Sequence, residues 1–411
     1  MSLNLADCIA IYAAKNPGKA AVFMDNIQMS YSEVDGAAQR VANILAAKGI
    51  GYGDRVAMIL PNTPHFPIVY FGILYTGATV VALNPLASEH ELSHILADTQ
   101  AKALFLWQDC VPNIGNAVGN SPTCEHLVVV EPKMEPEVPE SGESFVLLMA
   151  GASPSFEMYQ TMADDIAVIL YTAASDGKAK GAQLTHFNLF QNANVIAERV
   201  LNFDENDVCM SVLPLFHGFG QTAMMNACFI AGGTIALFPR FDAAKVFDCI
   251  EKRKVTRLAV VPTMVHFMLH FKKGIKFDLS SIKTFVVGGA AMDTKLPAAI
   301  AERFGVDIVQ GYGLTETSPV VSTNRNALEN RLGSVGKALW GCTAAIRNED
   351  GSFAGPNEEG EVVLKGHNIM TGYLNDPEGT AKVMRDGWFH TGDLGYLDED
   401  GYIFLTGVKK D

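Results

Sequence analysis

Small, hydroxyl-bearing and basic residues gather in the stretch AVILYTAASDGKAKGAQLTH, from Ala167 to His186. An apolar strand pattern leads into a loop with two glycines and two lysines, and a Thr-His-x-Asn helix start follows. Small residues let backbone N–H groups approach a phosphate, and a lysine neutralises its charge. The Walker A pattern is absent. The stretch therefore allows phosphate binding, while an ordinary flexible loop stays open as the alternative.

Two further segments could bind the remaining parts of a nucleotide. In VQGYGLTETSP, Tyr312 lies between two glycines at the end of an expected strand, where it can stack on a purine. Thr315 can donate to a phosphate, and Glu316 can bind Mg²⁺. In GWFHTGDLGYLDEDG, Asp393 follows a Thr-Gly turn and can accept two hydrogen bonds from a ribose diol. For the Tyr312 segment, a plain capped turn remains the alternative.

Alternating helix and strand patterns must position these segments. Before the first of them, the sequence predicts strands at 54–60, 102–107 and 126–131. An amphipathic pattern over 32–48 predicts a helix that ends at Gly49. Such alternation is typical of an α/β fold with a doubly wound, mostly parallel sheet.

A change of pattern along the chain predicts three subdomains. A second alternating set of strands runs from DIAVILYT to VDIVQGYG, and short strands separated by turns follow Ser322. The proline- and glutamate-rich stretch 131–144 is typical of a solvated connector. We therefore expect two related α/β subdomains, at 1–150 and 151–325, and a small β-rich, barrel-like subdomain at 326–411.

Composition restricts the partners and the compartment. With 31 basic and 45 acidic residues, the net charge of −14 argues against nucleic acid as a partner. Seven cysteines without a C-x-x-C pair argue against a disulfide framework and fit the cytoplasm. The uncharged run between Arg55 and Glu89 imitates a membrane span, but prolines and glycines interrupt it. We interpret it as a helix, a turn and a buried strand rather than as a transmembrane segment.

Taken together, the segments resemble the adenylate-forming superfamily, which comprises acyl-CoA synthetases, luciferases and the adenylation domains of peptide synthetases. The resemblance covers nearly the whole chain, and the motifs follow one another in the family's order. They are the phosphate loop at 171–181, PLFHGFG at 214–220, VVGGAAMD at 286–293, GYGLTETSP at 311–319, GSVGKALWG at 333–341, the pair Gly372-Tyr373 and HTGDLG at 390–395.

The resemblance implies an activity and its cofactors. A carboxylate would attack the α-phosphate of ATP to give an acyl-adenylate and pyrophosphate, and coenzyme A would then take the acyl group. Positioning and neutralisation of phosphate charge would supply most of the catalysis. ATP, Mg²⁺ and coenzyme A are thus the implied cofactors, and a small-molecule carboxylic acid is the implied substrate.

The resemblance also implies site residues. Lys180, Thr315, Glu316 and His217 would be catalytic, with Mg²⁺ on Glu316. The implied nucleotide-binding residues are Thr172, Ser175, Gly177, Gly289, Ala290, Gly311, Tyr312, Gly313, Thr315 and Asp393. Phe216 and Phe219 would flank the acyl pocket beside His217, and the small residues from Gly288 to Ala290 would keep its wall open.

The chain departs from the family pattern at the phosphate loop and at the hinge. Ala174 restricts φ where the family has glycine, and Asp176 adds a negative charge beside a polyphosphate. Val408 stands where the family has an arginine that touches ribose. The sequence ends at this hinge, so we expect the family's small C-terminal domain to be absent, with full catalysis impaired.

Several alternatives remain at the level of sequence. The pocket segments contain no charged residue for a substrate amine, which disfavours amino-acid activation and favours a fatty or aryl acid. Fatty-acyl-AMP ligases of the resembled family often carry an extra insertion near the β-rich part, and the compact span from Gly333 to Gly351 favours a CoA ligase instead. Ala174, Asp176 and Val408 motivate a non-catalytic nucleotide- or acyl-binding relative as the competing hypothesis. A homodimer and peripheral contact with a membrane stay open.

Histidine pairs offer a weaker, metal-based alternative. His90 and His94 fit the H-E-x-x-H pattern of zinc proteases, but the stretch falls where the resembled family has an ordinary helix. His266 and His270 are also four residues apart, among apolar neighbours, and we expect them on a core face. His186 could line the active site or cap a helix.

Overall fold

The computed structural model describes residues 3–132, 139, 141–172, 178–271, 276–290, 292–324 and 331–409. The chain divides into two compact units. The first comprises Met1–Phe190, Pro214–His217 and Tyr373–Asn375, and the second comprises Gln191–Leu213, Gly218–Gly372 and Asp376–Asp411. Among the described residues, no helix has the length and apolarity that crossing a membrane requires.

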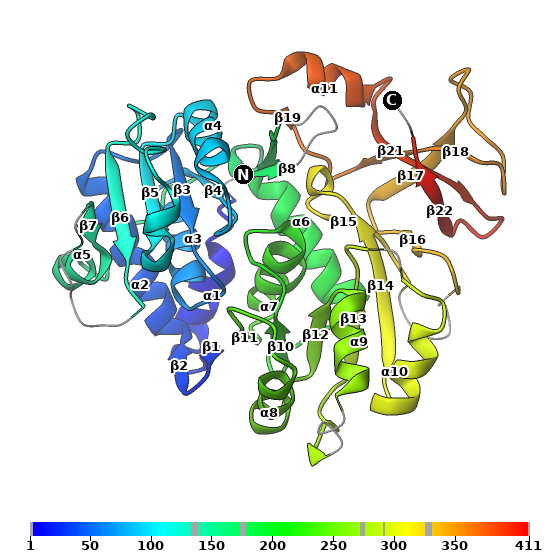
Figure 1. The fold of residues 1–411 in the computed structure, drawn as a ribbon, viewed down its shortest axis with the longest axis horizontal. Coiled ribbons are helices and arrows are strands. Elements are labelled where there is room, and N and C mark those ends of the chain that lie inside the picture. Colours follow the sequence, from blue (N-terminus) through cyan, green and yellow to red (C-terminus); the bar gives the residue numbers. More distant parts are fainter. Residues whose placement is uncertain are drawn as a thin grey trace. The chain divides into compact units, whose positions relative to one another are not determined.

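The first unit is built on a mainly parallel sheet with the strand order β19-β9-β8-β4-β3-β5-β6-β7 (Figure 1). Its strands are β3 (Arg55–Ile59), β4 (Thr79–Ala82), β5 (Ala103–Trp107), β6 (His126–Val130), β7 (Glu143–Ser144), β8 (Ile166–Thr172), β9 (Lys180–Thr185) and β19 (Gly372–Tyr373), and β1 (Ala20–Met24) and β2 (Ile27–Ser30) form an antiparallel hairpin. Its helices are α1 (Asp7–Lys15), α2 (Tyr31–Ala47), α3 (His65–Tyr75), α4 (Glu89–Thr99), the short 3₁₀ helix η1 (Gln108–Asn113) and α5 (Phe145–Gly151). Helix α6 (His186–Val195) begins in this unit.

Local sequence explains the helices that cover this sheet. Helix α2 begins at a capping box in which the Ser30 side chain accepts from the Glu33 N–H, and Gly49 follows its end with a φ of 71°. Helix α3 is buried from Phe66 to Tyr75, and all four residues of β4 are buried as well. The membrane-like run is therefore core, as the sequence predicted.

The second unit contains a sheet with the strand order β16-β15-β14-β13-β12-β10-β11. Strands β11 (Thr234–Leu237), β10 (Val208–Ser211), β12 (Arg257–Val260), β13 (Thr284–Val287) and β14 (Asp307–Gly313) are parallel, and β15 (Val320–Thr323) and β16 (Lys337–Ala338) are antiparallel. Helical elements of this unit are η2 (Ile196–Val200), η3 (Phe219–Asn226), α7 (Ala227–Ile230), α8 (Ala243–Arg253), α9 (Pro262–His270), α10 (Leu296–Phe304) and η5 (Thr315–Thr317).

A curled antiparallel sheet completes the second unit, coloured orange to red in Figure 1. Its order is β17-β18-β21-β20, with β22 paired to β21. The elements are β17 (Cys342–Arg347), β18 (Gly360–Gly366), α11 (Pro377–Val383), β20 (Met384–Arg385), β21 (Trp388–Leu397) and β22 (Ile403–Val408). The turn between β21 and β22 contains Gly401 with a φ of 82°, at the Asp-Gly pair that predicts a hairpin.

The predicted fold class is confirmed by these sheets, whereas the three subdomain boundaries stay a prediction. Most of the expected connector, 133–138 and Glu140, lies outside the described residues. At its C-terminal end, Glu143 and Ser144 are not a connector: they form β7, which pairs in parallel with β6.

Candidate nucleotide and acyl site

The predicted phosphate loop joins two antiparallel strands. Thr172 ends β8 and lies opposite Lys180, the first residue of β9. The structure therefore brings these two predicted site residues together at the loop end of a hairpin. Ser175 and Gly177 lie outside the described residues.

Strand β9 is a difference from the sequence-based expectation of a loop that leads directly into a helix. Helix α6 begins only at His186, after β9. A phosphate at this loop would therefore meet hairpin N–H groups and a lysine, with no helix N-terminus directly after the loop. The Nζ of Lys180 lies 5.5 Å from the centre of the Tyr373 ring, within reach of a cation–π contact.

The loop end of this hairpin is fixed by residues that sequence reasoning missed. The Tyr171 hydroxyl donates to Asp98 Oδ2 at 2.5 Å, and burial, followed by this bond, raises the pKa of Tyr171. Asn375 Nδ2 donates to the Asp98 carbonyl at 2.8 Å, and the Leu374 N–H donates to the Gly181 carbonyl at 2.8 Å. Asp98 thus orders the strand that presents Thr172. No motif marks Asp98 in the sequence.

In the second unit, Tyr312 and Asp393 meet across 81 residues of sequence. The Tyr312 hydroxyl on β14 donates to Asp393 Oδ2 on β21. Gly313 is required beside Tyr312, because a Cβ there would lie 1.9 Å from the Pro319 carbonyl oxygen. At Gly311 a Cβ would make only ordinary contacts, the nearest at 3.5 Å.

The electrostatics of this pair follow from its burial. Burial raises the pKa of Asp393, and the hydrogen bond from Tyr312 opposes that rise. Burial likewise raises the pKa of Tyr312, and the nearby Asp393 charge raises it further. The pair therefore consists of a neutral phenol that donates to a carboxylate with weakened acidity.

Strand register places the hinge beside Asp393. Val408 is the Cα partner of Asp393 in the β21–β22 pair, and 69% of Val408 is exposed. A longer side chain at 408 would therefore start on the strand next to this carboxylate. The Asp393 N–H donates to Thr391 Oγ1 at 3.0 Å, and that hydroxyl donates to the Val362 carbonyl at 2.8 Å.

Glu361 is a second positioning residue that the sequence did not reveal. Its Oε2 lies 3.1 Å from His390 Nδ1 and 3.5 Å from Lys409 Nζ, and its Oε1 accepts from the Gly392 N–H at 3.3 Å. Burial raises the pKa of Glu361, but the hydrogen bond and charge of His390, the charge of Lys409 and the Gly392 N–H together lower it below its usual value. The Glu361 carboxylate thus fixes the turn that precedes Asp393.

Thr315 and Glu316 lie in η5, directly after β14. Thr317 anchors this turn: its Oγ1 accepts from the Leu314 N–H at 2.9 Å. Glu316 is only 8% exposed, and its carbonyl accepts from the Met370 N–H at 2.9 Å. Protein sites for Mg²⁺ commonly use one or two carboxylates together with substrate phosphates. A single buried carboxylate at the end of β14 fits that pattern, in which Mg²⁺ would neutralise phosphate charge.

The predicted acyl-pocket residues fall into both units. In the first unit, Asn62 Oδ1 accepts from the Leu215 N–H at 2.9 Å and anchors the segment that carries His217. The His217 side chain is exposed, with its ring centre 6.2 Å from that of Phe216.

In the second unit, Gly288 is buried against Phe219. A Cβ at Gly288 would lie 3.2 Å from Phe219 Cε1 and 3.1 Å from the Gly311 carbonyl oxygen. Gly289 follows with a φ of +78°, which favours glycine, and Gly289 and Ala290 are exposed. The predicted pocket wall thus lies directly after β13, at the carboxyl edge of the parallel strands.

The other histidines take different places. His90 and His94 lie on α4, with His94 Nε2 3.3 Å from the Ala179 carbonyl oxygen. Within the described part of the chain, no group of three or more His, Cys, Asp or Glu side chains could hold a metal ion. His186 is 1% exposed and accepts from the Leu5 N–H at 2.9 Å. It therefore ties the N-terminal segment to the first unit, and burial lowers its pKa to about 4.

His266 and His270 pair on α9 rather than within a core. Their ring centres are 4.2 Å apart, and His270 Nδ1 lies 2.8 Å from the His266 carbonyl oxygen. Both histidines are exposed, so the expectation of a core face is wrong at both positions. Each polar ring can contact water there, which is why the apolar neighbours in sequence were misleading.

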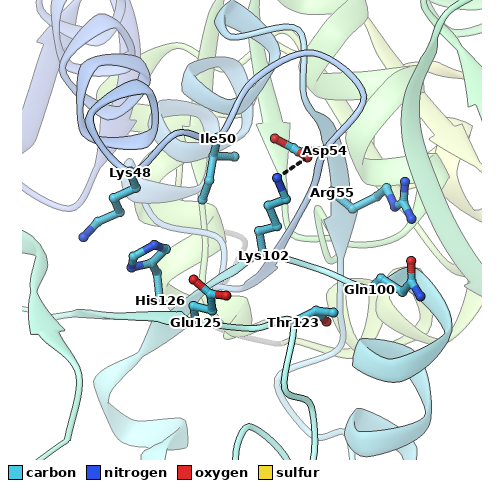
Figure 2. A pocket seen from close by; sticks show the side chains of 9 residues that line it. All are labelled: Lys48, Ile50, Asp54, Arg55, Gln100, Lys102, Thr123, Glu125 and His126. Carbon is cyan, nitrogen blue, oxygen red and sulfur yellow. Dashed lines mark ion pairs between the residues drawn. The ribbon is translucent and has the colours of Figure 1, made fainter.

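A polar pocket of about 340 Å³ lies at the amino ends of β3, β5 and β6 (Figure 2). Lys102 points toward Asp54 and pairs with it at 2.8 Å. Lys48 pairs with Glu143 at 2.5 Å, and Arg55 Nε donates to the Thr99 carbonyl at 2.6 Å. Because its cations already have partners, we interpret this pocket as a structural ion-pair network.

Comparison with known proteins identifies the family. The family described as "AMP-binding enzyme" matches residues 9–374. The chain belongs to this family. The resemblance drawn from the sequence is thereby confirmed, and the predicted cofactors, ATP, Mg²⁺ and coenzyme A, are those that adenylate-forming CoA ligases use.

Individual relatives are CoA ligases. The chain is 32% identical to a long-chain-fatty-acid–CoA ligase of Bacillus subtilis over 97% of its own length and 75% of the relative's. It is 33% identical to a feruloyl-CoA synthase of Amycolatopsis, over 97% of its length and 77% of the relative's. Among solved structures, the anthranilate CoA ligase AuaEII in complex with anthranoyl-AMP is similar with a TM-score of 0.94 and 28% identity, over 99% of this chain and 78% of that one.

Proposed function

We propose that the chain activates a fatty or aryl carboxylic acid with ATP and transfers the acyl group to coenzyme A. The match to the AMP-binding family over residues 9–374 carries this proposal, together with relatives that are named as CoA ligases. The acid's carboxylate oxygen bonds to the α-phosphorus, and the bond to pyrophosphate breaks. The thiolate of coenzyme A then attacks the acyl carbon, and AMP leaves.

Two pairs of residues share the nucleotide in this proposal. Tyr312 stacks on adenine, and Asp393 accepts from the ribose hydroxyls, which the Tyr312–Asp393 hydrogen bond supports. Lys180 neutralises phosphate charge as the reaction proceeds, and Thr172 lies across the hairpin from it. Thr315 donates to the α-phosphate.

The Mg²⁺ site and the acyl site complete the proposal. Glu316 binds Mg²⁺, which supplies charge neutralisation at the phosphates when it is bound. His217 and Phe219 contact the acyl group. Gly288 has no Cβ, and a Cβ at that position would crowd the Phe219 ring, so glycine keeps the space beside Phe219 open. Fatty and aryl acids are both retained as substrate classes, since the relatives named above act on one or the other.

Pyrophosphate release tests the activity. The chain is incubated with ATP, Mg²⁺ and a panel of fatty, aryl and amino acids, with and without coenzyme A. We expect release with at least one fatty or aryl acid and a fall of more than about tenfold for Glu316→Gln, because that change removes the charge that binds the cation. Glu378→Gln, on the first turn of α11, is the matched control. No pyrophosphate release with any acid of the panel would contradict the proposal.

A non-catalytic binding relative is the second candidate. The aliphatic, exposed Val408 opposite Asp393 favours it, because no charge at that position can reach a ribose. Ala174 and Asp176 motivated the same hypothesis and lie outside the described residues. AMP or acid binding without pyrophosphate release would support this candidate. Pyrophosphate release without consumption of coenzyme A would instead indicate a fatty-acyl-AMP ligase.

The remaining predictions concern location and assembly. All seven cysteines are free, which supports the proposed cytoplasmic location. The three subdomains, at 1–150, 151–325 and 326–411, and a homodimer are proposals as well. Limited proteolysis tests the subdomains, and light scattering of the purified protein tests the dimer.

A further inference from the structure

The first unit contains an apolar cavity of about 950 Å³ at the carboxyl ends of its parallel strands. Thr63, Pro64 and His65 follow β3, Trp107 ends β5, and Pro132 follows β6; all five line the cavity. None of the predicted nucleotide or acyl residues does. Ligand pockets are commonly about 300–1,000 Å³ and mainly apolar, so both size and lining suit a small molecule.

The topology of the sheet indicates that this location suits a ligand. In the order β4-β3-β5-β6, the chain leaves β3 to one side to form β4 and returns to the other side to form β5. The direction of winding therefore changes between β3 and β5. Open α/β sheets bind ligands outside the carboxyl ends of their strands at this change of direction. The cavity lies at that position, because its lining includes the segment after β3 and the end of β5.

Side chains of two kinds form the walls. Aromatic rings form one cluster in the lining, in which the His65 ring centre is 5.6 Å from that of Trp107 and 5.8 Å from that of Phe145. Methionines Met24, Met29 and Met149 also line the cavity. Unbranched, polarisable methionine side chains adapt to apolar ligands of different shape.

Helix α2 keeps this space open at a cost to its own stability. Gly36 lies in the interior of α2 and lines the cavity, although glycine weakens a helix interior relative to alanine. A Cβ at Gly36 would meet nothing closer than Pro154 Cβ at 4.0 Å. Gly72 in α3 is different, because a Cβ there would lie 2.5 Å from Val41 Cβ. Packing therefore explains Gly72, whereas Gly36 is explained by the open space beside it.

One cation faces the cavity from the same helix surface. Arg40 lies one turn after Gly36, and its Nη1 donates to the carbonyls of Met149 and Ala152. These bonds fix the guanidinium, and in the described structure Arg40 forms no ion pair. The other charged lining residue, Glu33, is exposed and caps α2 by accepting from the Ser30 N–H at 2.7 Å. A guanidinium fixed in this way is suited to a carboxylate.

We propose that this cavity binds an apolar carboxylic acid, with the carboxylate on Arg40 and the apolar body among Met24, Met149 and Phe145. The site is additional to the activity proposed above and does not depend on it. His65 adds no competing charge at neutral pH, because burial lowers its pKa to about 4.

Calorimetry with decanoate and decanol tests the charge at this site. We expect Arg40→Gln to weaken decanoate binding at the cavity by about tenfold or more, because a charge-assisted hydrogen bond is lost. Decanol should bind the variant as it binds the wild type, and Arg40→Lys should retain part of the decanoate affinity. Equal decanoate affinity in wild type and Arg40→Gln would overturn the role of Arg40.

Filling the cavity tests the location. Gly36→Leu should remove one decanoate-binding event, whereas Gly36→Ala, which adds only a methyl group, should retain it. Pyrophosphate release should be the same in both variants and the wild type, so a failure here is separable from a failure of the proposed function. Ala37→Leu provides a second filling variant if Gly36→Leu does not fold.

A crystal structure of the unmodified chain with 10-bromodecanoate decides between binding sites. Anomalous density for bromine between α2 and α5 would support the proposal. Bromine found only outside this cavity at a saturating concentration would overturn it, as would unchanged decanoate stoichiometry in both filling variants.

Discussion

Replacing Tyr312 with phenylalanine removes one hydroxyl group and the hydrogen bond that it donates to Asp393 Oδ2. A hydrogen bond to a charged group contributes about 1.5–3 kcal/mol to the free energy of unfolding. Water can partly replace the lost donor, because Asp393 is only half-buried. We therefore expect Tyr312→Phe to lower the free energy of unfolding by about 1–2 kcal/mol near neutral pH.

The loss of unfolding free energy caused by Tyr312→Phe should be larger at neutral pH than at low pH. The folded-state pKa of Asp393 is raised by burial, and Tyr312 opposes that rise. A carboxyl group with a raised folded pKa favours the folded state at low pH and loses that contribution as pH rises through the folded pKa. Without Tyr312 the pKa rises further, so the loss on raising the pH is larger in the variant. The difference between wild type and variant should therefore shrink toward about 0.5–1 kcal/mol as Asp393 becomes protonated.

Urea unfolding followed by tryptophan fluorescence measures this difference near pH 7.5 and pH 4. Trp388 lies on β21, the strand that carries Asp393, and reports unfolding there. Tyr396→Phe is the matched control, since Tyr396 lies on the same strand and stacks on Phe404 with ring centres 4.9 Å apart. An equal cost at both pH values, or an equal cost for Tyr396→Phe, would refute the reasoning.

Three other substitutions test the site and its supports. Gly288→Ala should displace Phe219, since the new Cβ would lie 3.2 Å from its ring; we expect about 1–3 kcal/mol less stability and kcat/KM shifted toward smaller acids, measured across the acid panel. Val408→Arg should lower the KM for ATP by roughly two- to tenfold if its guanidinium reaches the ribose beside Asp393, whereas Val408→Leu should not. His186→Asn should flatten the pH dependence of the free energy of unfolding. The folded-state pKa of His186, about 4, lies below the usual 6.5, so the wild type loses up to about 3 kcal/mol of that free energy as pH falls from 6.5 to 4. A variant whose free energy of unfolding falls equally with acid would contradict this.

The sequence predicted the elements that present the site because their patterns are local. Strands β3, β5 and β6 begin and end within two residues of the expected ranges. Helix α2 ends before Gly49, as the amphipathic pattern indicated. Tyr312 lies at the carboxyl end of its strand, as its motif predicted. A buried strand or an amphipathic helix leaves a periodic record in the sequence, so these features need no tertiary information.

The supporting residues could not be predicted in the same way, because their partners are distant in sequence. Asp98 and Asn375 are separated by 277 residues, and Glu361 contacts Lys409 across 48. Strand β9 was missed for a related reason. It pairs with β8 in a hairpin, whereas the small residues and glycines of the sequence between them suggested a long loop. Such contacts depend on topology, and one sequence contains no periodic signal for them.

Two glycines in adjacent helices separate packing from ligand binding as reasons for a missing side chain. Both Gly36 and Gly72 interrupt good helical patterns, and the sequence alone treats them alike. At Gly72 the neighbouring Val41 leaves no room for a Cβ, so Gly72→Ala should destabilise the pair of helices α2 and α3. At Gly36 the nearest atom is at van der Waals distance, so Gly36→Ala should stabilise α2 by about 0.5–1 kcal/mol. If Gly72→Ala lowers the free energy of unfolding and Gly36→Ala raises it, then packing requires the glycine at position 72, whereas at position 36 the glycine lowers stability and leaves the space beside it open.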